Sequence, residues 1–189
     1  MHTPAHMFAG AALFARAGRP AVTRAAILGG LLPDVPLILM VGWSLWVMRL
    51  PPGVVFDQLY FSGAWQAVFE IDHNLWLWSI AAALSVALRA PTATAFTLSG
   101  LLHAVTDFLL HHDDARRQLW PVTDWVFRSP VSYWDPAHYG RITGPLELFL
   151  CAALAVVLWR RFAGKAARAL ILLGLVAEAG PPILFTLFH

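Results

Sequence analysis

Six apolar stretches run along the chain, separated by short basic turns and by two longer polar segments. They cover roughly residues 4–15, 21–48, 74–88, 92–111, 145–159 and 166–188. Crossing the hydrocarbon layer takes about twenty residues at 1.5 Å each, so all but the first are long enough if they tilt or the bilayer thins slightly. The stretch 4–15 crosses only with its flanking residues, or inserts halfway. The pattern predicts an all-α integral membrane bundle of about five or six helices, forming one domain over residues 1–189.

The second stretch is interrupted by the sequence Leu32-Pro33-Asp34-Val35-Pro36. Proline has no backbone N–H and its ring clashes with the preceding helical turn. Two prolines this close together predict a break in the helix. Broken backbone at membrane depth is tolerated where neighbouring protein groups or a water-filled cavity can satisfy it.

Composition supports the membrane assignment and excludes other classes. Apolar residues make up 59% of the chain and charged residues 13%, with a mean hydropathy of +0.64. A net charge of +2 without a basic stripe does not favour nucleic-acid binding. Only one cysteine, Cys151, is present, so any bound metal must take histidine and carboxylate ligands. The first arginines follow an apolar run instead of preceding it, which is unlike a cleaved secretory signal.

The basic residues predict an orientation. In a six-crossing arrangement, one side receives Arg16, Arg19, Arg24, Arg89, Arg160, Arg161, Lys165 and Arg168 without any acidic residue. Positive charge is retained on the cytoplasmic side, so both termini and the loops of about 49–73 and 112–144 are predicted to be extracytoplasmic. Tryptophan and tyrosine are frequent in these loops, which suits segments that lie at the headgroups and cover the bundle as a lid.

Ionisable side chains inside apolar segments mark the candidate site, because each costs a few kcal/mol or more at membrane depth unless it has a partner. These residues are Asp34, His103, Asp107, Glu147 and Glu178, with His6, His73 and His111 at the ends of segments. Their predicted depths allow these groups to meet in one cavity that opens outward.

The densest group is His103, Asp107 and His111, spaced four residues apart on one helix face. An imidazole and a carboxylate at this spacing are a common way to bind zinc or a similar divalent ion. The alternative is a hydrogen-bonded His–Asp pair that fixes helix packing. The cost of burying an unneeded aspartate in lipid favours the metal.

Other members of the group also have structural alternatives. Asp34 can cap the helix that restarts after Pro33, and His6 can be an ordinary interfacial residue. His73 can be a loop residue, or a ligand oriented by the neighbouring Asp72. Glu147 is expected to cap a helix first and to act as a catalytic base second. Glu178, near a broken backbone, can satisfy freed donors or face the cavity.

These residues resemble those of the membrane-bound metal-dependent hydrolases, a family of small bacterial inner-membrane proteins. The likeness lies in the run Pro-Ala-His-Met-Phe-Ala-Gly around His6, the element Leu31-Leu32-Pro33-Asp34, His73 before an apolar helix, and Leu102-His103 with Asp107, followed by Trp120-Pro121. It covers residues 1–125 and implies a metal site made by His6, Asp34, His73, His103 and Asp107. Family members commonly carry a second Asp where this chain has Pro36, and Thr-His-Ser where it has Asp72-His73-Asn74, which does not favour a two-metal centre.

The first functional hypothesis is therefore a zinc-dependent hydrolase of the bacterial inner membrane, with its site facing the periplasm. It would act on a lipid head group or another phosphoester, with Asp107 or Glu147 as base. The second is a non-catalytic membrane subunit whose polar or metal-filled core docks a membrane-protein partner or a second copy. The third is a small transporter, and similar proteins are also labelled as cobalamin-biosynthesis proteins, which no residue pattern here supports.

Overall fold

The structure, a computed structural model, describes the backbone of residues 1–188 and the side chains of residues 1–180. This part of the chain is helical and contains no strand, which confirms the predicted fold class. The long helices are α1 (Thr3–Phe14), α2 (Pro20–Leu31), α3 (Val35–Gly42), α5 (Gly63–Asp72), α6 (Leu75–Ala87), α7 (Pro91–Leu110), α8 (Gly140–Arg161) and α9 (Lys165–Phe188).

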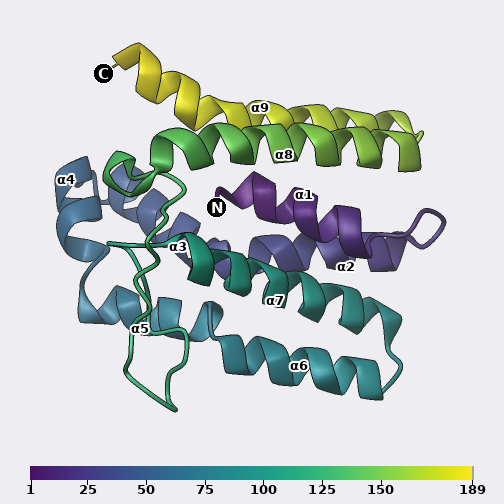
Figure 1. Cartoon of the computed structure of the whole chain (residues 1–189), viewed down its shortest axis with the longest axis horizontal. Helices are drawn as coiled ribbons and strands as arrows, with labels where there is room; N and C mark the ends of the chain where they lie inside the picture. Colours follow the sequence, from purple (N-terminus) through teal and green to yellow (C-terminus); the bar gives the residue numbers. More distant parts are fainter. Residues whose placement is uncertain (189) are drawn as a thin grey trace.

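The long helices lie roughly parallel or antiparallel to one another (Figure 1). Helix α7 packs between α2 and α6, and α1 contacts α2, α7 and α8. Helix α9 packs on α8 at the opposite edge from α6. Helix α1 therefore lies at the centre of the bundle and connects its two halves.

Three helices are long and apolar enough to cross a bilayer. They are the continuous helical segment Pro20–Val47 with 28 residues, Pro91–Leu110 with 20 and Gly140–Arg161 with 22. Helices α1 and α6, with 12 and 13 residues, span only about 18–20 Å. Among the described residues, length and composition thus support three crossings, whereas the sequence predicted a bundle of about five or six helices and the orientation argument assumed six crossings.

The predicted break in the second apolar stretch is confirmed. Residues Leu32–Asp34 form a 3-10 turn (η1), and α3 starts at Val35. Pro36 falls in the first turn of α3, where a backbone N–H would make no hydrogen bond within the helix, so the missing N–H of proline costs nothing there. Helical structure then continues through the π-helical segment η2 (Trp43–Val47). The break therefore changes the helix type locally, and Pro20–Val47 remains one continuous candidate membrane span.

Two glycines let three helices approach closely near the break. A Cβ atom on Gly29 would lie 2.1 Å from the backbone oxygen of Phe96 in α7, and one on Gly30 would lie 2.7 Å from the backbone oxygen of His6 in α1. Small residues at helix interfaces are the usual means of close packing in membranes. Here they bring the backbones of α1, α2 and α7 together beside His6 and His103.

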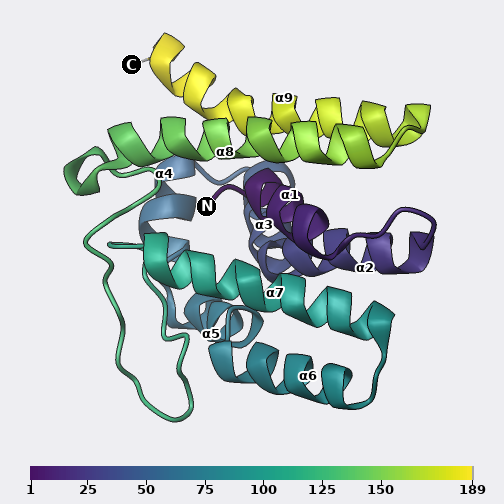
Figure 2. The ribbon, with the colours of Figure 1, turned by 45° about the vertical axis from the view of Figure 1, so that its right-hand side comes forward.

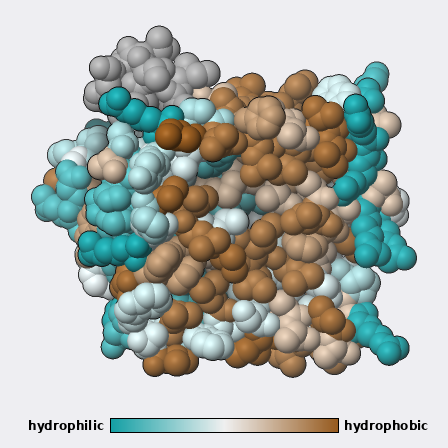
Figure 3. All heavy atoms as spheres, in the orientation of Figure 1, coloured by the Kyte–Doolittle hydropathy of each residue, from teal (hydrophilic) through white to brown (hydrophobic). Residues whose placement is uncertain are grey.

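An apolar band covers the middle of the visible face, with hydrophilic surface at both ends (Figure 3). Large apolar side chains are exposed along the helices, including Trp46 (80% exposed), Phe149 (72%) and Val176 (70%). The turns α1–α2, α6–α7 and α8–α9 all lie at one end, and they carry or adjoin the basic residues singled out above (Figure 1). This distribution is typical of a helical membrane protein.

The predicted extracytoplasmic loops differ from expectation. Residues 49–73 are mostly helical, containing α4 (Pro52–Val54), the π-helical segment η3 (Val55–Leu59) and α5, whose first turn is capped by the Ser62 hydroxyl. Helical structure satisfies backbone groups where water is scarce, which explains why this segment is not a simple loop. Helix α8 begins at Gly140 instead of about 145, so the loop after α7 is shorter than predicted (Figure 2). This loop has irregular structure up to the 3-10 turn η4 (Pro136–His138), which comes just before α8.

Candidate metal centre

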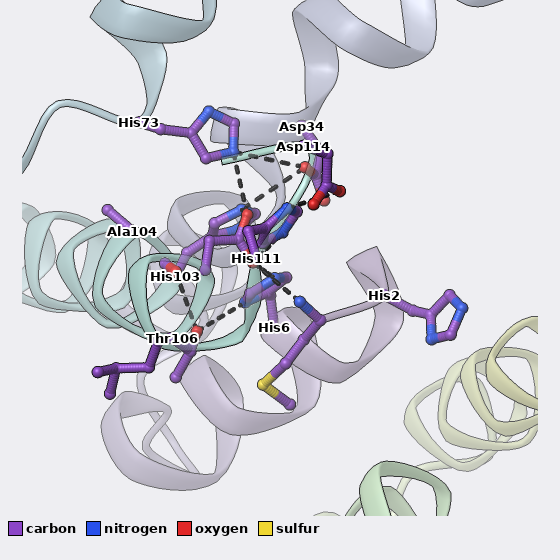
Figure 4. A network of polar contacts seen from close by, with 12 residues as sticks. His2, His6, Asp34, His73, His103, Ala104, Thr106, His111 and Asp114 are labelled. Atoms are coloured by element: carbon purple, nitrogen blue, oxygen red, sulfur yellow. Dashed lines mark hydrogen bonds and ion pairs between the residues drawn. The ribbon is translucent and has the colours of Figure 1, made fainter. Parts of the chain in front are cut away.

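Four histidines and two aspartates from four parts of the chain meet inside the bundle (Figure 4). His6 comes from α1, Asp34 from η1 at the break, and His73 from the corner between α5 and α6. His103 and Asp107 lie one turn apart on α7, and His111 follows at its end. All six residues are buried, with exposures of 7% or less.

The inner group consists of Asp34, His73, His103 and Asp107, whose ligand atoms all lie within 4.8 Å of one another. Nε2 of His73 is 3.3 Å from Oδ2 of Asp107 and 3.7 Å from Oδ1 of Asp34. Nε2 of His103 is 3.4 Å and 3.5 Å from the same two oxygens. Two imidazole nitrogens and two carboxylate oxygens therefore face a common point.

These separations suit metal ligands better than hydrogen bonds. Hydrogen bonds between nitrogen and oxygen centre on about 2.9–3.0 Å, and neither Nε2 of His73 nor Nε2 of His103 has a hydrogen-bond partner. Ligands bonded at about 2.1 Å to a tetrahedral zinc ion lie about 3.4 Å apart. The group could therefore hold a metal ion with little rearrangement.

The outward-facing nitrogens of these two histidines have acceptor partners. Nδ1 of His103 donates to the backbone oxygen of Gly30 at 2.8 Å, and Nδ1 of His73 donates to the carboxylate of Asp72. A carbonyl or ionised carboxylate oxygen can only accept, so Nδ1 of each histidine carries a proton. In the neutral imidazole, Nε2 then directs a lone pair inward. Fixing a ligating imidazole through its other nitrogen is a regular feature of protein metal sites.

His6 is held in the same way on the other side of Asp107. The Thr106 hydroxyl lies 3.2 Å from Nδ1 of His6 and donates its own hydrogen to backbone oxygens of α7, so it accepts from the imidazole. Nε2 of His6 then faces Oδ1 of Asp107 at 2.9 Å. The amino group of Met1 also lies 2.9 Å from this oxygen.

His111 completes this second side. Its Nε2 lies 3.3 Å from Oδ1 of Asp107, and its Nδ1 lies 2.8 Å from Oδ2 of Asp114. Burial opposes ionisation of Asp114, but the contact with His111 holds the pKa of this carboxyl below its ordinary value. The two oxygens of Asp107 thus face different partners, with His73 and His103 at Oδ2 and His6 and His111 at Oδ1.

A buried arginine borders the cluster. Nη1 of Arg116 lies 3.7 Å from Oδ2 of Asp107, Nη2 donates to the Tyr60 hydroxyl at 3.2 Å, and the guanidinium lies over the ring of Phe69. Burial disfavours its charge, but Tyr60 and Asp107 keep the pKa of Arg116 above its ordinary value. Its Nε and Nη1 have no hydrogen-bond partner, and the side chain lines a small pocket together with Asp107, His111 and Phe127.

Three structural alternatives raised by the sequence do not fit these positions. Asp34 makes no capping hydrogen bond and instead accepts from the Thr3 hydroxyl at 2.6 Å. His6 is only 2% exposed, so it is not an interfacial residue. His73 does lie in the turn between α5 and α6, but its side chain is fully buried and faces the cluster. Glu147 lies beyond the first turn of α8, because that helix starts at Gly140, and it is therefore no N-terminal cap.

The structure brings together the five predicted metal ligands but separates the two predicted catalytic residues. Asp107 is at the centre of the cluster, whereas Glu147 contacts His2 and lies in a group with Glu178. His111 also joins the cluster, as the polar stripe and its expected depth allowed, although it was not among the predicted ligands. Its spacing from Asp107 was the available signal, while no sequence pattern placed Asp114 or Thr106 beside this site.

Comparison of the chain with protein-family models, with curated proteins and with solved structures finds no match.

Proposed function

We propose that this protein is a membrane-bound, zinc-dependent hydrolase that cleaves a phosphoester in a lipid head group. The observation that carries the proposal is the convergence of two unpartnered imidazole nitrogens and two carboxylates at ligand spacing, deep in the bundle. The resemblance of residues 1–125 to the membrane-bound metal-dependent hydrolases supports the same activity. Asp34, His73, His103 and Asp107 would hold the ion.

Zinc is the preferred ion because two imidazoles and two carboxylates form a mixed nitrogen and oxygen set without thiolates. A zinc ion in such a site lowers the pKa of a bound water to about 7 and polarises the bond to be cleaved. Asp107 already faces the Met1 amino group and Arg116. The ion-pair partners of Asp34 among the described residues are histidines, so a bound cation would compensate the buried charge of this carboxylate. The charge of the site and its geometry therefore both favour a bound zinc ion.

His111 is the best-placed proton acceptor. Its Nε2 has no hydrogen-bond partner and lines the pocket beside Asp107, while its Nδ1 faces the carboxylate of Asp114. A carboxylate at Nδ1 stabilises the imidazolium that forms when Nε2 accepts a proton. In hydrolysis, an oxygen–phosphorus bond to water forms and the ester P–O bond breaks. The proton passes from the water to His111 and then to the leaving oxygen.

Arg116 favours an anionic substrate. A buried guanidinium with unpartnered N–H groups is costly, and a phosphate oxygen would accept from it. The pocket that contains Arg116 adjoins the proposed ion, so one phosphate group can reach both. Because the helices expose apolar surface to lipid on either side, a phospholipid head group is the proposed source of this phosphate.

The proposed location is a bacterial inner membrane with the site facing the periplasm. The turns α1–α2, α6–α7 and α8–α9 gather basic residues at one end of the helices (Figure 1). Asp107 and His111 lie at the opposite end of α7 from the α6–α7 turn. Positive charge near membrane segments is retained in the cytoplasm. The cluster and the segment 111–139 then face the other side.

The test is metal content and hydrolysis measured on the same detergent-purified, full-length protein. Zinc per chain is determined after dialysis for the parent, for Asp107→Asn and for Asp124→Asn, a matched change at an exposed aspartate (80% exposed side chain). Hydrolysis is followed with a short-chain phospholipid in mixed micelles and with p-nitrophenyl phosphate as a soluble phosphoester.

We expect at least one bound zinc per chain and lipid hydrolysis in the parent and in Asp124→Asn. Asp107→Asn should bind one zinc fewer per chain and should lose the hydrolysis. Cleavage of p-nitrophenyl phosphate alone would support the hydrolase but reject the lipid head group. Zinc binding without cleavage of either compound would favour a non-catalytic membrane subunit with a structural metal. A parent protein that takes up no added zinc would overturn the proposal.

A further inference from the structure

A second buried group of ionisable side chains lies outside the histidine cluster. His2 precedes α1, Glu147 belongs to α8 and Glu178 to α9, and their ligand atoms lie within 4.8 Å of one another. Both glutamates are almost fully buried, at 5% and 2% exposure. In Figure 4 the His2 ring points away from the histidine cluster, so the two groups are separate.

The contacts inside this group leave coordinating atoms free. The backbone N–H of His2 donates to Oε1 of Glu147 at 2.6 Å. Nδ1 of His2 lies 3.1 Å from that oxygen and 3.7 Å from Oε1 of Glu178. The other carboxylate oxygen, Oε2, has no hydrogen-bond partner on either glutamate, although both are buried.

The charge of the group is not balanced by other side chains. No arginine or lysine among residues 1–180 forms an ion pair with Glu147 or Glu178, whose one ion-pair partner there is His2. Two buried carboxylates this close repel each other strongly in a low-dielectric interior. Either a proton or a cation must therefore compensate the charge.

We propose that His2, Glu147 and Glu178 bind a second divalent metal ion, separate from the one in the histidine cluster. Its ligands would be one imidazole nitrogen and two carboxylates, a set suited to zinc or manganese. The ion would cross-link the chain before α1 to helices α8 and α9. Because His6 follows His2 by one helical turn, this ion positions α1 relative to the other half of the bundle.

The test is a count of bound ions in the full-length protein. The parent, the double variant Glu147→Gln/Glu178→Gln and the control Glu70→Gln are each titrated with Zn²⁺ and with Mn²⁺. Glu70 is a matched control, because it is also buried but already pairs with Arg117 at 2.5 Å. His103→Ala is measured alongside to count ions in the histidine cluster separately.

We expect the double variant to bind one ion fewer than the parent and than Glu70→Gln, while keeping the ion that His103→Ala loses. An unchanged ion count in the double variant would overturn the proposal and leave a shared proton as the compensating charge. A misfolded double variant does not end the test. Anomalous scattering from parent crystals soaked in Mn²⁺ should then show a peak between Glu147 and Glu178, and its absence would reject the site.

Discussion

Asp72 hydrogen-bonds to Nδ1 of His73, its neighbour in the chain, and so turns Nε2 of that histidine toward Asp34 and Asp107. The contact joins the carboxylate of the last residue of α5 to a fully buried imidazole. It fixes both the ring orientation and the nitrogen that carries the proton. If the histidine cluster holds a metal ion as proposed, Asp72 would support its binding without contacting the ion directly.

Replacing Asp72 by Ala should weaken zinc binding about 10- to 100-fold, the usual effect of removing such a supporting carboxylate. The measurement is competition for zinc between the protein and a chromophoric chelator. Asp72→Asn keeps an acceptor oxygen and should retain more affinity than Asp72→Ala. Equal affinity in the parent and in Asp72→Ala would show that the contact does not support a ligand.

Removing the metal should destabilise the bundle. An ion that binds only the folded state at 100 times its dissociation constant adds about 2.7 kcal/mol of stability. The Tm of the parent should therefore fall after chelation and recover when zinc is added back. Asp107→Asn should show a smaller response than the parent to both treatments. A parent Tm that is the same with chelator and with zinc would contradict a tightly bound ion.

Arg116→Lys should impair binding of an anionic substrate more than binding of metal. Lysine keeps the charge but cannot reproduce the planar donor geometry that contacts Tyr60 and faces Asp107. Loss of a hydrogen bond to a charged group corresponds to about 1.5–3 kcal/mol, or roughly a 10- to 100-fold rise in KM. Steady-state kinetics on the phospholipid probe measure this rise. An unchanged KM would remove Arg116 from the substrate site.

Gly29→Ala should destabilise the packing of α2 against α7. The added methyl group would meet the backbone oxygen of Phe96, which cannot rotate away as a side chain can. Overpacking of this kind costs about 1–3 kcal/mol. Thermal unfolding in detergent gives the comparison, with Gly164→Ala as control because nothing lies within 4 Å of its added Cβ. Equal Tm values for the two variants would contradict the close approach.

Cysteine labelling in cells tests the orientation. Cys151 is buried, so it can remain in the background protein. A membrane-impermeant maleimide should label Asp113→Cys, beside the metal centre, and should label Arg89→Cys, in the α6–α7 turn, only after the membrane is permeabilised. The reverse pattern would place the site in the cytoplasm and contradict the orientation inferred from the basic residues.

The helical fold could be predicted because it depends on local pattern. Apolar runs of sufficient length must form helices in lipid, where every backbone donor and acceptor needs an internal partner. The break at Pro33 and Pro36 could be predicted for the same reason, since proline removes a donor wherever it occurs. The high cost of burying charge also marked Asp34, His103 and Asp107 directly in the sequence.

Only the tertiary structure decided which of these groups meet and which nitrogen each histidine presents. The close approach at Gly29 and Gly30 brings His6 and His103 together, although 97 positions in the chain separate them. The tertiary structure also directs Arg116 toward Asp107, and it places Glu147 beside His2 instead of in the histidine cluster. Such contacts depend on how helices cross and where loops return. The periodicity of one segment carries no information about either.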